Sequence, residues 1–132
     1  MKYVDTDVFL YWALDHAEFG DTATRLLRHI ELNEKACTSS LSLYLMDGVL
    51  SQLDAPDYDF AQLVHTLEKI RNLKIEPLTE KTLMGAATVR EELDVPLDVA
   101  AGIVVATDRK ADGVYSNNAD WEKGPLPRLF KP

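Results

Sequence analysis

The stretch Asp98–Trp121, DVAAGIVVATDRKADGVYSNNADW, decides the fold of this chain. From Val99 to Ala106 every residue is apolar or glycine, which predicts a helix that is covered on several sides. A tight turn, a short strand over residues 113–115 and a polar loop that ends at Trp121 follow this helix. A buried helix that leads back into a strand is typical of an α/β protein.

Asp98 is the polar exception at the head of this apolar helix. A carboxylate here could cap the first turn, where free N–H groups and the helix dipole favour negative charge. It could equally bind a metal ion, because Asn118 and Asp120 follow the next strand closely and are placed to meet it. Both interpretations stay open from the residues alone.

The composition fits one globular domain over residues 1–132, with 46% hydrophobic and 27% charged residues. No apolar run is long enough to cross a bilayer, and the acids near the start do not suit a signal peptide. We therefore expect a cytoplasmic protein. The single cysteine, Cys37, cannot form an internal disulfide and lies in an apolar run, so we expect it in the core.

The charge balance is acidic, with 22 acidic against 14 basic residues and a net charge of −8. This disfavours non-specific binding to nucleic acid, because each phosphate contact normally uses a Lys or Arg. It does not exclude a nuclease, since a cluster of carboxylates can be neutralised by divalent cations.

Predicted strands and helices alternate along the chain. Strands are predicted over residues 2–4, 35–38, 74–76 and 113–115, with a last short strand after Gly124. Helices are predicted over residues 8–14 with Asp7 as cap, from Asp21 as cap through 30, over 41–53 after Ser39 and Ser40, over 60–70, and from Thr79 to 93. Residues 54–59, with three acids and a proline, are predicted to be a solvated loop.

This alternation indicates a parallel sheet with helices on both faces. The carboxyl ends of its strands and the amino ends of the following helices would share one edge, where Asp5, Asp98 and Asp120 would meet. Carboxylates gathered without basic partners repel one another, and a bound Mg²⁺ or Mn²⁺ commonly neutralises their charge. No glycine-rich phosphate loop, serine nucleophile elbow, Cys/His zinc set or dinucleotide fingerprint competes in the sequence.

Asp47 is a further candidate, on the helix predicted over residues 41–53. It shares a stripe with Leu43 and Leu50, and a carboxylate among leucines must be paired, hydrogen-bonded or metal-bound. The alternative, that Asp47 lies at the margin of the stripe and contacts water, stays open.

The chain resembles the PIN domain, the small metal-dependent ribonuclease fold found in VapC-type toxins. The resemblance spans essentially the whole length and rests on four segments, namely YVDTDV (residues 3–8), Thr38-Ser39, LDVA (97–100) and SNNADW (116–121). It implies a PIN-like three-layer α/β/α fold with a central, mostly parallel sheet of about four or five strands.

The same resemblance implies a set of acids. Asp5 matches the first metal-binding acid, Asp98 the acid that heads a helix, and Asp120 an acid of the closing motif Thr-x-Asp-x-Asp-Phe. Two positions depart from the family pattern. Asn118 stands in place of the first acid of that motif, and the helix acid, usually a Glu, falls by counting on Leu45, so that only a shift along the helix reaches Asp47.

The implied activity is hydrolysis of RNA phosphodiester bonds by a water that Mg²⁺ or Mn²⁺ activates. Asp5, Asp98 and Asp47 would hold the first metal ion, with Asp120 and Asn118 in a second or outer position. Thr6, Ser116 and Arg109 would contact the substrate, together with the basic residues Lys110, Lys123 and Arg128. The implied partners are RNA, an antitoxin protein and a second copy in a homodimer, without a membrane.

Two rival interpretations remain. Leu45 and Asn118 favour a catalytically degenerate PIN-fold module that acts by binding protein or RNA. Alternatively, Asp5-Thr6-Asp7-Val8 resembles the Asp-x-Asp opening of haloacid dehalogenase-type phosphatases, in which Asp5 would form an aspartyl-phosphate.

Overall fold

The computed structural model describes residues 1–53 and 57–131. In these residues the chain forms one sheet of five strands in the order β3-β2-β1-β4-β5, and all neighbouring strands run parallel. The strands are β1 (Lys2–Val4), β2 (Ala36–Ser39), β3 (Leu73–Glu76), β4 (Gly113–Tyr115) and β5 (Arg128–Leu129). The predicted parallel α/β sheet is therefore confirmed.

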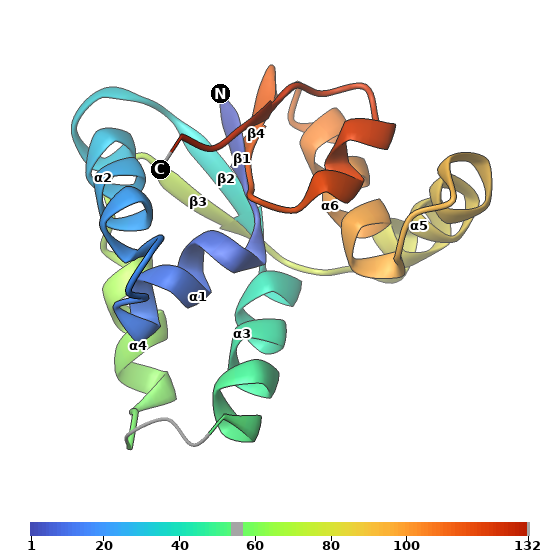
Figure 1. The fold of residues 1–132 in the computed structure, drawn as a ribbon. Helices are drawn as coiled ribbons and strands as arrows, with labels where there is room; N and C mark the ends of the chain where they lie inside the picture. Colours follow the sequence, from blue (N-terminus) through green and yellow to red (C-terminus); the bar gives the residue numbers. More distant parts are fainter. Residues whose placement is uncertain (54–56, 132) are drawn as a thin grey trace.

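Helices cover both faces of this sheet (Figure 1). One layer holds α1 to α4 and the other holds α5 and α6. Their bounds are α1 (Thr6–Leu14), α2 (Gly20–Asn33), α3 (Ser40–Gln52), α4 (Phe60–Glu68), α5 (Glu80–Leu93) and α6 (Leu97–Asp108), and a 3-10 helix η1 (Ala119–Lys123) follows β4.

Successive residues of β1, β2 and β4 contribute to different cores, because side chains alternate across a strand. Tyr3 of β1 belongs to the core under α5 and α6, and Val4 belongs to the core under α1 to α4. The register pairs Tyr3 with Cys37 and with Val114, so that three adjacent strands bury side chains on the α6 side. Cys37 is fully buried, as expected.

Helix α6 is the most buried helix of the second layer, as its sequence predicted. Its buried residues are Val99, Ala100, Ala101, Gly102, Ile103, Val105 and Ala106. The indole of Trp121 packs so closely on Gly102 that a Cβ there would lie 2.8 Å from the ring. Glycine is therefore needed at this crossing, because any larger residue would displace the indole.

The predicted helix starts were partly wrong. Asp5, not Asp7, is the N-cap of α1, because the helix already begins at Thr6. Asp21 lies inside the first turn of α2, whose N-cap is Phe19. Ser39 and Thr79 do cap α3 and α5 through their hydroxyls, as predicted.

The predicted loop over residues 54–59 falls partly on residues 54–56, which lie outside the described residues. Within the described part, the Asp59 side chain accepts a hydrogen bond from the Gln62 N–H and caps α4. Among residues 1–53 and 57–131, no helix combines the length and apolar character needed to cross a membrane.

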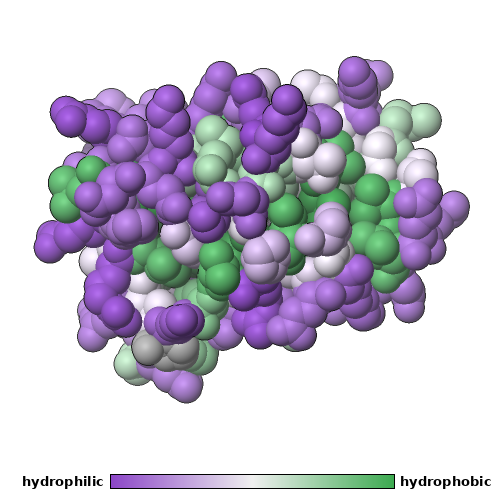
Figure 2. All heavy atoms as spheres, turned by 90° about the horizontal axis from the view of Figure 1, so that it is seen from above, coloured by the Kyte–Doolittle hydropathy of each residue, from purple (hydrophilic) through white to green (hydrophobic). Residues whose placement is uncertain are grey.

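The amino ends of the strands meet at a polar edge of the sheet. There the Lys2 ammonium lies 3.2 Å from the Glu34 carboxylate and 2.9 Å from that of Asp112. Seen from above, this side of the molecule presents mostly hydrophilic residues around a smaller hydrophobic area (Figure 2). The opposite edge, at the carboxyl ends of the strands, holds the candidate site.

Candidate active site

A hollow of about 260 Å³ opens at the carboxyl end of β1. Its polar lining comes from the end of β1, the start of α1, the first turn of α6 and the loop after β4. The lining residues are Asp5, Thr6, Asp7, Leu10, Leu45, Val49, Asp98 and Asn118. Residues far apart in the sequence meet here because parallel strands place their carboxyl ends at one edge.

Asp5 is the most constrained acid of this hollow. Its Oδ1 accepts a hydrogen bond of 2.8 Å from the Thr6 N–H. Its Oδ2 accepts bonds of 2.7 Å from the Ser116 hydroxyl and 2.9 Å from the Trp121 indole N–H. Burial raises the pKa of Asp5, these hydrogen bonds oppose the rise, and the charge of Asp98 adds to it.

Asp7 lies beside Asp5 and is partly buried. Its Oδ2 accepts a hydrogen bond of 2.8 Å from the Asn117 N–H, whereas its buried Oδ1 has no hydrogen-bond partner among the described residues. Burial, followed by the charge of Asp5, raises the pKa of Asp7 to about 7. Leaving a buried carboxylate oxygen without a partner is costly, so this atom is suited to a ligand.

Asp98 and Asn118 complete the polar lining. Helix α6 has Pro96 at its N-cap, so Asp98 lies within the first turn, where the helix dipole favours its charge, and it is exposed. Asn118 caps η1 instead, since its Oδ1 accepts a hydrogen bond of 3.0 Å from the Asp120 N–H. Asp120 itself is not among the residues that line the hollow.

Helix α3 presents Leu45 and Val49 to the hollow, and not Asp47. The Asp47 carboxylate accepts a hydrogen bond of 2.8 Å from the Tyr58 hydroxyl. Residues four apart share a face of a helix, whereas residues two apart point in nearly opposite directions. The structure thus brings Leu45, the position reached by simple counting, to the acids.

The three residues expected to contact the substrate lie in different places relative to the hollow. Thr6 lines the hollow, and Ser116 is buried behind it, where its hydroxyl donates to Asp5 and accepts from the Asn118 N–H at 3.0 Å. Arg109 lies outside the hollow, in an ion pair with Glu76.

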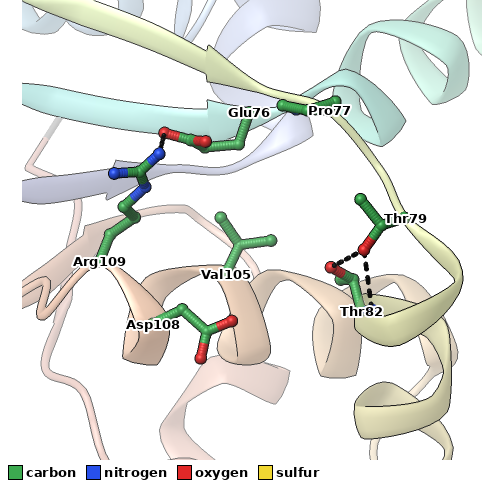
Figure 3. Close-up of a pocket in the computed structure, with 7 residues that line it drawn as sticks. All are labelled: Glu76, Pro77, Thr79, Thr82, Val105, Asp108 and Arg109. Atoms are coloured by element: carbon green, nitrogen blue, oxygen red, sulfur yellow. Dashed lines mark hydrogen bonds and ion pairs between the residues drawn. The ribbon is translucent and has the colours of Figure 1, made fainter.

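That ion pair belongs to a separate pocket of about 330 Å³ at the far end of α6 (Figure 3). The pocket is lined by Glu76, Pro77, Thr79, Thr82, Val105, Asp108 and Arg109. Two further basic residues also have protein partners, since the Lys123 ammonium donates to the Asp94 carbonyl and Arg128 pairs with Glu122. None of the basic residues expected to touch RNA lines the hollow over residues 1–53 and 57–131.

The carboxylate oxygens of the hollow are ligands that a hard cation prefers, but they do not form a complete coordination shell. In the part of the chain that the structure describes, no group of three or more His, Cys, Asp or Glu side chains is close enough to hold a metal ion by itself. Mg²⁺ commonly binds through one or two carboxylates and completes its shell with waters and substrate phosphates. The buried, unpartnered Oδ1 of Asp7 beside Asp5 fits that mode.

Asp7 lines the hollow, although the sequence did not lead us to expect it among the metal-binding acids. The available signal was its spacing from Asp5. Once Asp5 ends a strand and caps the next helix, a carboxylate two positions later lies in the first turn, close to the same point.

The amino-acid sequence matches the PIN domain family over residues 2–123, and the chain therefore belongs to this family. The comparison with curated proteins gives no match. The family match and the fold support the PIN interpretation over the haloacid dehalogenase alternative.

Solved structures share the fold over nearly the whole chain. VapC20 of Mycobacterium tuberculosis, a sarcin-ricin loop cleaving toxin, superposes with a TM-score of 0.80 at 15% identity, covering 99% of this chain and 100% of that one. VapBC2 of Rickettsia felis, bound to a DNA fragment of its promoter, gives 0.69 at 18% identity, with 99% and 100% covered. FitAcB of Neisseria gonorrhoeae gives 0.67 at 13% identity, with 98% and 96% covered.

Proposed function

We propose that this chain is a metal-dependent ribonuclease, the toxin of a VapBC-type toxin–antitoxin pair. The observation that carries the proposal is the convergence of Asp5, Asp7 and Asp98 on one hollow at the carboxyl edge of the sheet. Membership of the PIN family and the fold shared with a toxin that cleaves the sarcin-ricin loop point the proposal toward RNA.

Asp5 and Asp7 would hold Mg²⁺ or Mn²⁺, with waters and a substrate phosphate completing the shell, and Asp98 would contact one of those waters. A bound divalent cation supplies a lowered pKa for an attacking water and stabilises the leaving oxygen. Asp120 and Asp47 take no part in this proposal, because neither lines the hollow and Asp47 is bonded to Tyr58.

The protein's own groups have separate tasks. Three donors hold the Asp5 carboxylate in one orientation. Asp98, exposed on α6, can accept a hydrogen bond from the attacking water and orient it. Because the Oδ1 of Asn118 is used by η1, its Nδ2 is the group left to donate to a phosphate oxygen.

Leu10, Leu45 and Val49 form an apolar wall beside the acids. This wall limits the access of bulk water on one side, which strengthens the electrostatic contacts inside the hollow.

The proposal includes an antitoxin protein, a homodimer and a cytoplasmic location. The antitoxin is supported by two solved structures that share the fold, a toxin–antitoxin complex from Klebsiella pneumoniae and VapBC2 of Rickettsia felis. Co-expression with the antitoxin would give a stable complex by size exclusion.

The direct test incubates the purified chain with end-labelled structured RNAs, including a sarcin-ricin stem-loop. Mg²⁺ and Mn²⁺ are each compared with EDTA. We expect discrete cleavage products with either ion, and their loss in EDTA and in Asp98→Asn prepared in parallel. Cleavage by the purified chain that persists both in EDTA and in Asp98→Asn would contradict the proposal.

A catalytically degenerate PIN module is the second candidate, and the position of Leu45 favours it. An apolar side chain stands on the hollow where the family resemblance implies an acid. Titration calorimetry with Mn²⁺ separates the two candidates. Saturable heat supports the nuclease, and no heat together with RNA or protein binding supports the module.

A further inference from the structure

Trp121 connects the closing 3-10 helix to the first acid of the hollow. Its side chain is 1% exposed, and its indole N–H donates a hydrogen bond of 2.9 Å to Oδ2 of Asp5. The two residues are far apart in sequence and meet because β1 and β4 are adjacent parallel strands. A hydrogen bond from a buried donor to a carboxylate is among the stronger ones in proteins.

The indole is held in place by packing on two sides. It lies against Tyr3 of β1, with ring centroids 5.4 Å apart and an interplanar angle of 37°. On α6 it lies over Gly102, where a Cβ would come within 2.8 Å of the indole Cη2 and Cζ2 atoms. Real Cβ atoms do not approach so closely, so the absence of a side chain at position 102 determines where the N–H points.

The bond from Trp121 affects which oxygen of Asp5 remains available. A carboxylate has about four acceptor positions. Trp121 and Ser116 both donate to Oδ2, whereas Oδ1 receives only the Thr6 N–H. Oδ2 is thus occupied by protein donors, and Oδ1 retains capacity for a further partner.

We propose that Trp121 is a positioning residue. Seated by Gly102, it fixes the carboxylate of Asp5 so that Oδ1 is the oxygen presented to a cation or substrate. The catalytic meaning of this arrangement rests on the proposed function, whereas the arrangement itself can be tested independently.

The first experiment observes the contact directly. The indole N–H resonances of Trp12 and Trp121 are assigned in ¹⁵N-labelled protein with Trp12→Phe and Trp121→Phe. We expect the Trp121 proton to resonate downfield of Trp12, to move upfield in Asp5→Asn, and to shift on addition of Mg²⁺. A Trp121 resonance that does not respond to Asp5→Asn would overturn the proposal.

The second experiment measures the consequence for metal binding and catalysis. Loss of a group that orients a metal ligand typically costs about 10- to 100-fold in affinity or activity. We expect Trp121→Phe to weaken Mn²⁺ binding and lower kcat by about tenfold or more, with little change in KM for RNA. Trp12→Phe is the matched control and should match wild type.

A double-mutant cycle excludes a general loss of packing. Gly102→Ala should displace the indole and reproduce the weakened Mn²⁺ binding. In the Trp121→Phe background, Gly102→Ala should weaken Mn²⁺ binding little further, because phenylalanine lacks the Cη2 and Cζ2 atoms that would contact a Cβ at position 102. Equal and additive losses from the two substitutions would contradict the positioning role.

The outcomes distinguish the two proposals. If wild type neither binds metal nor cleaves RNA, the proposed function fails, and the indole resonance still decides whether Trp121 fixes Asp5. If wild type is active and folded Trp121→Phe binds Mn²⁺ and cleaves RNA equally well, only the positioning role fails.

Discussion

Asp47 and Tyr58 are joined by a hydrogen bond of 2.8 Å from the tyrosine hydroxyl to the carboxylate. The same hydroxyl also lies 3.3 Å from the Asp47 carbonyl. Asp47 thus connects α3 to the segment that precedes α4, while Leu45 and Val49 face the hollow. The Asp47 carboxylate therefore has a hydrogen-bond donor in the neighbouring segment and does not need a cation as its partner.

Asp47→Asn should therefore leave RNA cleavage within about twofold of wild type, the usual range for a substitution away from the reacting groups. The melting temperature should fall slightly, because the bond to Tyr58 is weakened. Tyr58→Phe removes the same bond and should have the same effect. A loss of cleavage in Asp47→Asn but not in Tyr58→Phe would return Asp47 to the active site.

Asp98→Asn should lower the cleavage rate by at least about 100-fold, the scale of losing one transition-state-stabilising group. The fold should persist, because Asp98 is exposed and is not the cap of α6. Circular dichroism and thermal melting check the fold. Asp108→Asn, at the exposed end of the same helix, is the matched control, and unchanged cleavage by Asp98→Asn would refute its assigned role.

Asp7 should make the metal-free protein less stable as pH rises. Its pKa is raised on folding from 3.8 to about 7, so the folded state holds the proton more tightly. This contribution to stability is complete below pH 3.8 and is lost as pH rises through 7. Thermal melts across this interval should show a fall of roughly several degrees.

Asp7→Asn should flatten that pH dependence and remove most of the stabilisation that Mg²⁺ gives at pH 8. For wild type, an ion at 100 times its Kd adds about 2.7 kcal/mol. Asp15→Asn, an exposed acid beyond the same helix, serves as the control. If Asp7→Asn leaves the pH dependence of the melting temperature unchanged, the group that titrates is not Asp7.

Leu45→Glu should convert part of the apolar wall into an additional ligand. The new carboxylate would face Asp5, Asp7 and Asp98, so metal-free stability should fall through like-charge repulsion. Mn²⁺ affinity should rise about tenfold, equivalent to 1.4 kcal/mol. Leu45→Gln has the same shape without the charge, and equal Mn²⁺ affinity in the two variants would show that position 45 does not reach the ion.

Local patterns predicted the elements well where a pattern extends over several residues. The buried helix α6 followed from its apolar run, and the caps Ser39 and Thr79 followed from capping preference. The N-cap of α1 could not be predicted from capping preference, because both Asp5 and Asp7 have the required side chain. Which of them caps depends on the residue at which the backbone turns, and that point is set by packing.

The site was predicted in part. The convergence of Asp5 and Asp98 followed from parallel strand order. The choice between Leu45 and Asp47 did not, because both lie on one helix and only its rotation against the sheet decides which side chain faces the hollow. Asp120 was expected in a second or outer position around the metal ion, but its backbone N–H donates to the Asn118 cap of η1 and its side chain does not line the hollow.

The sequence alone determined that this chain forms a parallel α/β sheet with acids at the carboxyl ends of its strands. Hydrophobic periodicity and the alternation of strands and helices along the chain depend on neighbouring residues, so they can be recognised in the sequence. Only the tertiary structure decided which oxygens remain available at those strand ends. That depends on contacts between distant segments, as when the Trp121 indole, seated on Gly102, occupies one oxygen of Asp5. Such contacts leave no periodic signal in the sequence.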